Sequence, residues 1–150
     1  MTEAEYQAYL PRTIQDYADE NVRAGYWTKE ESLEKSQAVF NQLLPQGEKT
    51  PDQHLYTIRD AESGNSIGII WINLQSKRNP PSAFIYDIAI DEDQRGKGFG
   101  TATMLAIEDE ARRLGAHSIA LHVFGHNQTA FSLYQKVGYA ITSYNMRKEL

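Results

Sequence analysis

The part of the sequence that decides the fold reads Phe84-Ile85-Tyr86-Asp87-Ile88-Ala89-Ile90-Asp91-Glu92-Asp93-Gln94-Arg95-Gly96-Lys97-Gly98-Phe99-Gly100-Thr101. An apolar run typical of a β-strand ends in acidic turn residues, and alternating glycines and cations then open a helix. Glycines lack a Cβ atom, so backbone N–H groups there can approach a phosphate closely. The start of a helix adds unpaired N–H donors and a positive dipole end, and Arg95 and Lys97 add full charges. The stretch therefore predicts a pyrophosphate-binding turn between a strand and a helix.

The length and composition of the chain are typical of one globular domain with a hydrophobic core. The absence of cysteine excludes disulfides, thiolate metal ligands and a cysteine nucleophile, and it fits a reducing compartment. No apolar run approaches the ~20 residues that span a bilayer, and residues 1–5 lack the apolar core of a secretory signal. We therefore expect a single domain over residues 1–150, in the cytoplasm and without a membrane partner. The net charge of −5 argues against a nucleic-acid partner.

The order of the predicted elements indicates the fold class. The pattern predicts a helix over residues 3–24 that Pro11 kinks or divides, and a second helix to about residue 44 with a capping box at Thr28 and Glu31. The later elements are strands at 55–60, 66–74 and 83–90, a helix at 98–114, a strand at 116–123, a helix at 128–137 and short strands at 139–142 and 144–147. This order implies an α/β fold with a mixed sheet, in which the 83–90 and 116–123 strands are joined by a right-handed crossover. Ligands in such sheets bind beyond the carboxyl ends of strands, where the glycine-rich turn lies.

Two better-known phosphate-binding motifs do not fit the turn. A P-loop needs four residues between its first glycine and a Gly-Lys-Ser/Thr sequence, and that pattern is absent. The Rossmann fingerprint fails because the window from Gly98 ends in Thr103, where glycine or alanine belongs, and residues 120–122 offer no carboxylate for a ribose. The glycines alone could serve only a tight connection between strand and helix. A second motif is needed to decide between these readings.

Two segments together resemble the GNAT superfamily of N-acetyltransferases. The run Arg95–Gly100 resembles that family's Arg/Gln-x-x-Gly-x-Gly/Ala motif, and residues 121–139 resemble its later motif, in which a strand leads to an Asn and a helix ends in Leu-Tyr-x-x-x-Gly-Phe/Tyr. The resemblance covers residues 55–147 and implies a mixed, mostly antiparallel sheet flanked by helices, with central strands splayed for acetyl-CoA. Family members usually begin with a β-strand, whereas this chain begins with the helix-like Thr2–Leu10. The helical region, including residues 17–21 and 25–27, resembles a bacillus-type subgroup of the family.

The resemblance implies that acetyl-CoA is the donor. Its pyrophosphate would lie on the N–H groups of Arg95, Gly96, Lys97, Gly98, Phe99, Gly100 and Thr101. Its pantetheine arm would pair with the backbone of Ile88, Ala89 and Ile90 like an added strand, and an N–H there would stabilise the oxyanion formed in transfer.

Residues of the later motif would complete the site. Tyr134 matches the family's common general acid. Asn127 would contact the cofactor, cap its helix, or do both. No metal is expected, because the spacing of His117, His122 and His126 resembles no ligand set.

The general base is open between three groups. His122 occupies a strand position where some family members carry a catalytic Glu, and a neutral imidazole can accept a proton at neutral pH. Asp87 on the other strand is the second candidate, and an ordered water is the third. We expect His126 to be a solvated turn residue.

The acceptor is expected to be a primary amine of a small molecule or a protein, and its identity is open. We expect its site among the N-terminal helices, the 55–74 hairpin and the last strands. Candidate wall residues, for most of which core packing is the simpler role, are Tyr26, Trp27, Trp71, Tyr86, Tyr139 and Tyr144. The acidic residues that could attract a cationic amine, or form a solvated helix face, are Glu20, Glu30 and Glu31.

The sequence thus favours direct acetyl transfer in a ternary complex, with a homodimer as a further possibility. The alternatives are a transferase for another acyl group or a hydroxyl acceptor, and a non-catalytic acyl-CoA sensor.

Overall fold

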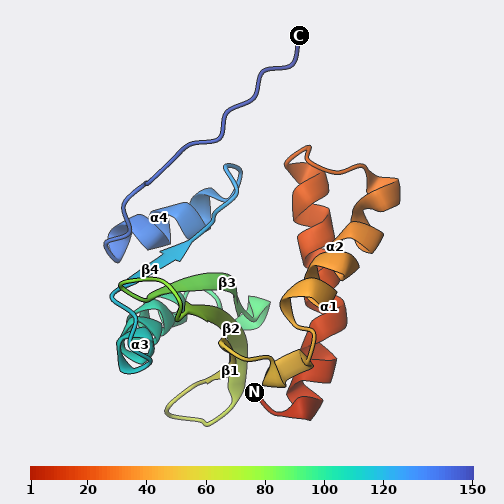
Figure 1. The fold of residues 1–150 in the computed structure, drawn as a ribbon. Helices are drawn as coiled ribbons and strands as arrows, with labels where there is room; N and C mark the ends of the chain where they lie inside the picture. The colour runs from red at the N-terminus through yellow and green to blue at the C-terminus, as the bar shows by residue number, and fades with distance from the viewer.

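A computed structural model describes all 150 residues, and Figure 1 shows a central sheet with helices on both sides. The elements, in chain order, are α1 (Glu3–Arg23), α2 (Lys29–Leu43), the single turn η1 (Gly47–Lys49), β1 (Gln53–Arg59), β2 (Ser66–Gln75), β3 (Ser82–Ile90), the single turn η2 (Glu92–Gln94), α3 (Phe99–Arg113), β4 (Ser118–Leu121) and α4 (Gln128–Lys136). No helix has the length and apolar character that crossing a bilayer requires.

The chain begins with a helical pair and has no strand before it. The predicted capping box at Thr28 and Glu31 is in place at the start of α2, and Thr2 forms a second capping box, which was not predicted, at the start of α1. Of the two outcomes predicted for Pro11, a kink or a division, the division does not occur, because α1 runs unbroken from Glu3 to Arg23. The backbone hydrogen bond that proline removes is offset by the packing of α1 on α2, which includes a buried bond from the Ser36 hydroxyl to the Ile14 carbonyl at 2.6 Å.

The sheet has the mixed, mostly antiparallel topology that the sequence predicts. Its order is β1-β2-β3-β4, with antiparallel pairs except for the parallel pair of β3 and β4. Pairing between β3 and β4 runs only from Ser82 opposite Ser118 to Ile85 opposite Leu121, although β3 continues to Ile90. The two strands therefore part toward their carboxyl ends, which leaves the backbone of residues 86–90 without a neighbour on the β4 side.

Each face of the sheet is covered by its own hydrophobic cluster. On one face Trp71 and Leu55 pack with side chains of α1 and α2, including Ile14 and Phe40. On the other face the alternate β2 residues Ile70 and Ile72 pack with Ile85, Met104, Ile107 and Tyr134, which come from β3, α3 and α4. The period-2 alternation along β2 thus holds both helical layers on the sheet.

A β-bulge in β3 sets the direction of the side chains beside the splayed region. The register shifts by one between Trp71 and Ile72 of β2, so that Tyr86 is an extra residue in β3. Tyr86 stacks on Trp71 at 4.7 Å between ring centroids, and the next residue, Asp87, bonds to side chains of α1. The bulge therefore turns two successive side chains toward the α1–α2 face.

The two strands predicted after α4 are absent. Residues 139–150 form no strand, and Figure 1 shows this segment, which we call the C-terminal tail, running away from the sheet. The predicted strands 139–142 and 144–147 are separated by one residue, and the tightest common hairpin loop needs two. The preceding strand is also shorter than the predicted 116–123, because pairing with β3 ends at Leu121.

Gly68 of β2 lets the backbone at the end of β3 approach closely, and replacing it should destabilise the folded protein. A Cβ atom at this position would lie 2.2 Å from the carbonyl oxygen of Ala89, which belongs to the backbone and cannot move aside cheaply. We expect Gly68→Ala to lower the free energy of unfolding by about 1–3 kcal/mol. Thermal unfolding followed by circular dichroism measures this loss. Gly125→Ala is the matched control, since nothing lies within 4 Å of a Cβ there, and equal melting temperatures for the two variants would contradict the prediction.

Candidate functional site

The glycine-rich turn between β3 and α3 presents a row of free backbone donors. The backbone N–H groups of residues 96–101 make no hydrogen bond within the protein, and no side chain caps the start of α3. Gly98 stands at the cap position with φ +85°, and Gly96 has φ +74°. Both values lie in the left-handed region that glycine adopts without strain. The donors and the positive end of the α3 dipole therefore form a concave site for an anion.

Two cations and one close packing contact flank this turn. The Arg95 side chain donates from Nε to the carbonyl of Ile90 at 3.0 Å, which fixes the turn to the end of β3. The Lys97 ammonium donates to Gln94 at 3.0 Å and is otherwise exposed. A Cβ at Gly100 would lie 3.1 Å from the Leu133 side chain, so this glycine lets the start of α3 approach α4. The predicted cofactor-binding residues of the turn thus lie together on one surface.

The predicted pantetheine-binding residues lead directly into this turn. Ile88, Ala89 and Ile90 pair with β2 on one side and have no strand on the other, because β4 has already diverged. Asp91 continues the connection through its N–H, which donates to Ile67 at 2.9 Å. The free backbone edge of β3 and the anion site are therefore continuous along the chain.

Two hydroxyl groups of α1 hold the side chain of Asp87, which directly precedes this free edge of β3. The hydroxyls of Tyr9 and Thr13 each donate to its Oδ2 atom at 2.7 Å. The carboxylate makes no ion pair. Burial raises the pKa of Asp87, and the two hydroxyl hydrogen bonds oppose part of that rise. The site therefore contains a half-buried acid that has no cation of its own.

Tyr134 lies on α4 with its ring in the sheet core. Its side chain is buried, with 8% of the residue exposed, and its hydroxyl makes no hydrogen bond to another protein group. Burial raises the pKa of Tyr134, and the negative charge of Asp87 adds to the rise. Tyrosine and carboxylate are therefore close enough to interact electrostatically, and the tyrosine keeps its proton at neutral pH.

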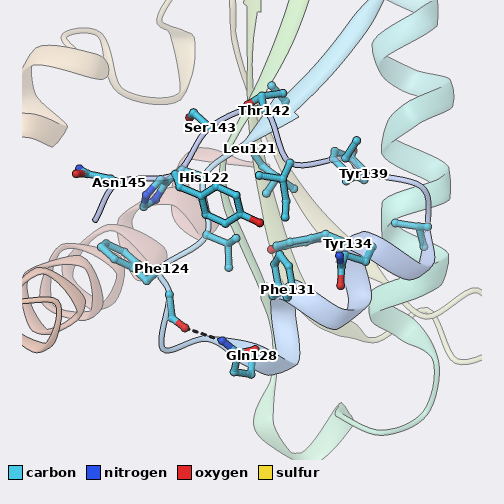
Figure 2. Close-up of a pocket in the computed structure, with 18 of the residues that line it drawn as sticks. Leu121, His122, Phe124, Gln128, Phe131, Tyr134, Tyr139, Thr142, Ser143 and Asn145 are labelled. Atoms are coloured by element: carbon cyan, nitrogen blue, oxygen red, sulfur yellow. Dashed lines mark hydrogen bonds between the residues drawn. The ribbon is translucent and has the colours of Figure 1, made fainter. Parts of the chain in front are cut away.

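A large groove opens beside Tyr134, and Figure 2 shows most of the side chains that line it. Its volume is about 1060 Å³, and its walls come from residues 119–126, α4 and the C-terminal tail. His122 and Tyr134 both line it, so the structure brings the two predicted catalytic residues to one cavity. The glycine-rich turn lies outside it.

The loop that joins β4 to α4 is ordered by its own hydrogen bonds. The Asn127 side chain accepts from the N–H of Ala130 at 3.1 Å, which confirms its predicted capping role. Gln128 donates to the carbonyl of Gly125 at 2.7 Å, the dashed line in Figure 2.

His126 differs from its prediction as a solvated turn residue. It is half-buried and contacts the Glu20 carboxylate of α1, and its ring stacks on Phe124 at 5.5 Å. The turn is drawn in because α1 supplies this acidic partner, which lies 106 positions away in the sequence.

The six aromatic residues predicted to form an acceptor wall separate into two groups. Tyr26, Tyr139 and Tyr144 line the groove. Trp27, Trp71 and Tyr86 instead pack against other aromatic rings, at 4.7 to 5.7 Å between centroids.

Of the three candidate acidic residues, Glu31 forms a capping box and an ion pair with Lys35, and Glu30 is exposed on α2. No group of three or more His, Asp or Glu side chains is positioned to hold a metal ion.

Sequence reasoning missed Tyr9 and Thr13. They are one helical turn apart on α1, and this spacing places both on one face of the helix. Their partner Asp87 is 78 and 74 positions away. Nothing local in the sequence connects the two regions.

Comparison with known proteins agrees with this geometry. Residues 10–139 match the model of the acetyltransferase (GNAT) family. Two uncharacterised N-acetyltransferases of Bacillus subtilis align over all of this chain: YdgE is 37% identical over 95% of its length, and YycN is 39% identical over 96%. The crystal structure of YycN superimposes with a TM-score of 0.95, covering 100% of this chain, the C-terminal tail included, and 95% of that chain. The chain therefore belongs to the GNAT family of acetyltransferases.

Proposed function

We propose that this protein transfers the acetyl group of acetyl-CoA directly to a primary amine within a ternary complex. The observation that carries this proposal is the continuity of three features. A row of free N–H donors at residues 96–101 leads into the unpaired edge of residues 88–90, and that edge begins at Asp87. An extended cofactor with a diphosphate at one end and a reactive group at the other matches these three features in this order.

The residues present fit acetyl-CoA, the cosubstrate that the GNAT family uses. The N–H groups from Gly96 to Thr101, with Arg95 and Lys97, would hold the diphosphate. Ile88, Ala89 and Ile90 would pair with the amides of the pantetheine arm, and Asn127 would contact the cofactor from the α4 side. When bound, acetyl-CoA supplies an activated acetyl thioester.

Two side chains would move the protons of the reaction. Tyr134 retains its proton because burial and the Asp87 charge raise its pKa, and it would donate that proton to the departing thiolate. Asp87 would attract an ammonium group, since its charge has no ion pair in the protein, and would accept the amine's proton. This unpaired carboxylate is also what favours an amine over a hydroxyl acceptor.

His122 is the competing candidate for the base. It lies exposed at the end of β4, lines the groove with Tyr134, and meets the Phe124 ring edge-to-face at 5.0 Å. An exposed imidazole can take a proton directly or through water. The half-buried position of Asp87 and its two fixed hydroxyl partners make the carboxylate the better-oriented group.

A thiol-release screen tests the proposed activity. The protein is incubated with acetyl-CoA and a panel of polyamines, amino sugars, amino acids and lysine peptides, and free CoA thiol is measured. We expect at least one amine to release thiol in a stoichiometric ratio to acetylated product. Tight binding of acetyl-CoA with no thiol release from any amine would favour a sensing module. Release with alcohols alone, or with a longer acyl-CoA alone, would identify the other transferase alternatives.

Removal of the Lys97 charge should weaken acetyl-CoA binding. A charge-assisted hydrogen bond to phosphate contributes about 1.5–3 kcal/mol, so we expect Lys97→Ala to raise the Kd by about 10-fold or more at low salt and by less at high salt. Isothermal titration calorimetry measures both values. Lys77→Ala is the matched control, because Lys77 is also an exposed lysine but lies in the turn between β2 and β3. Equal affinities for the two variants would show that Lys97 contacts no phosphate.

A further inference from the structure

The side chains of Tyr9 and Thr13 join α1 to β3 through a single carboxylate oxygen. Both hydroxyl groups donate to Oδ2 of Asp87 at 2.7 Å, and no side chain donates to Oδ1. Each carboxylate oxygen can accept two hydrogen bonds, so two donors on one oxygen use its capacity and fix the plane of the carboxylate. The other oxygen keeps its lone pairs for a group that comes from outside α1.

We propose that Tyr9 and Thr13 are positioning residues for acetyl transfer, which hold Asp87 so that Oδ1 is the atom that accepts the proton of the amine. This inference rests on the proposed function, in which Asp87 is the base. An N–H bond of the ammonium group breaks, its proton forms an O–H bond with Oδ1, and the electron pair stays on nitrogen for attack on the thioester carbon. Neither hydroxyl touches the acceptor in this step, because each acts through the carboxylate.

The two hydroxyls lie on a part of α1 that packing holds in place. They are one helical turn apart and share one face of the helix. Thr13 is only 6% exposed, and its neighbour Ile14 belongs to the core cluster against which Tyr9 also packs. The bond from the Ser36 hydroxyl to the Ile14 carbonyl ties the same turn of α1 to α2. The donors are therefore supported by the core, as the residues that orient a catalytic group need to be.

The ionisation of the groups around Asp87 suits this role. Burial raises the pKa of Tyr9, and the charge of Asp87 adds to the rise, so this phenol keeps the proton that it donates. Burial also raises the pKa of Asp87, and the hydrogen bonds from Thr13 and Tyr9 oppose that rise. The other titratable groups that interact with Asp87 are Asp16 of α1, whose charge raises the pKa of Asp87 further, and Tyr134 of α4. The two hydroxyls are thus the side chains that favour the charged, proton-accepting form.

A purely structural role for the two hydroxyls makes a different prediction. Hydroxyls that only pin α1 to β3 would contribute to the free energy of unfolding, and their loss would not change the rate at which an ionised Asp87 works. Hydroxyls that orient the base affect the rate even at a pH where Asp87 is fully ionised. The value of kcat on the plateau above the acidic limb therefore separates the two roles.

Thiol release measured over a range of pH tests the positioning role in Tyr9→Phe and Thr13→Val, which each remove one hydroxyl and keep the rest of the side chain's shape. Loss of a donor disfavours the charged form of Asp87, so the acidic limb of kcat/KM should move to higher pH. The plateau of kcat should fall about 10-fold because the base is no longer held in line. The KM for acetyl-CoA should stay near the wild-type value. Thr13→Ser keeps a hydroxyl and should return the limb and the plateau toward those of the wild type.

A matched control and a second measurement accompany the kinetics. Tyr17→Phe removes a tyrosine hydroxyl from the same helix that makes no bond to Asp87, and it should leave the pH profile unchanged. Carbon-13 NMR follows the titration of the Asp87 carboxyl without turnover, and the signal is assigned by its absence in Asp87→Asn. Its midpoint should rise in Tyr9→Phe and Thr13→Val and stay near the wild-type value in Tyr17→Phe.

The outcomes separate this inference from the proposed function. A wild-type limb and plateau in both Tyr9→Phe and Thr13→Val, an unchanged NMR midpoint in both, or an equal change in Tyr17→Phe would overturn the positioning role and leave acetyl transfer in place. Lower thermal stability with wild-type kinetics would show a structural role only. No thiol release from the wild-type protein with any amine would overturn the proposed function and this inference with it.

Discussion

Replacing Tyr134 by Phe should lower kcat by a factor of about 10² to 10⁴, the usual range for loss of a general acid. The reason is that its hydroxyl makes no hydrogen bond within the protein and keeps its proton because burial and the Asp87 charge raise its pKa. Without that proton the thiolate must leave as a free anion. Steady-state thiol release under saturating acetyl-CoA measures the change.

The same variant should bind and fold almost normally, which separates a catalytic role from a structural one. Because the lost hydroxyl has no partner, the free energy of unfolding should change by less than about 1 kcal/mol. The affinity for acetyl-CoA should also stay near that of the wild type. Tyr139→Phe is a suitable control, since it removes another buried tyrosine hydroxyl in the same cluster. Full activity of Tyr134→Phe would remove the role assigned to this residue.

Replacing Asp87 by Asn should also cost a factor of about 10² to 10⁴ in kcat/KM, because it removes the proposed base. The amide oxygen can still accept the hydroxyl protons of Tyr9 and Thr13, so the contacts of α1 with β3 are preserved. In the wild type, kcat/KM should rise with pH through an apparent pKa above the ordinary aspartate value. The variant should lack this acidic limb.

The stability of the Asp87 variant should change in the opposite direction to its activity. Burial raises the pKa of Asp87 in the folded state, so the folded protein binds this proton more tightly than the unfolded chain. That stabilising contribution is fully present below the ordinary aspartate pKa and is lost as the pH rises through the raised value. The variant has no such loss. Relative to the wild type, its free energy of unfolding should therefore increase between about pH 4 and pH 7.

A parallel His122→Gln variant decides between the two candidate bases. If Asp87 is the base, His122→Gln should keep the acidic limb of the pH profile and most of the activity. Loss of that limb in His122→Gln, with a normal profile in Asp87→Asn, would assign the base to the histidine. Denaturation curves for both variants exclude unfolding as the cause.

The geometry of the glycine-rich turn was predictable from the sequence because the residues that determine it are adjacent in the chain. Glycine spacing, two cations and a strand-to-helix transition fall within residues 84–101, and each has a direct physical meaning in that order. The cap at Asn127 and the capping box of α2 were predictable for the same reason. Splaying of β3 and β4 followed from the family resemblance, and the register confirms it.

The proposed acceptor side depends on contacts between distant parts of the chain. The Asp87 network joins β3 to α1, and the Glu20–His126 contact joins α1 to the loop before α4. No local sequence pattern indicates that these distant residues lie in contact. The tail shows a different limit, since residues 139–147 have the composition of strands but no partner strand within the same copy. β-propensity describes how well a residue fits a sheet, and it does not supply the neighbouring strand.

Calorimetry with two ligands tests whether the turn at residues 96–101 holds the diphosphate of acetyl-CoA. Acetyl-CoA is titrated into the protein alongside S-acetyl-pantetheine, which keeps the thioester and the arm but lacks the nucleotide and its diphosphate. We expect acetyl-CoA to bind far more tightly, with an affinity that falls as salt is added. Equal affinities for the two ligands, or no heat of binding for acetyl-CoA, would show that the turn does not bind the diphosphate.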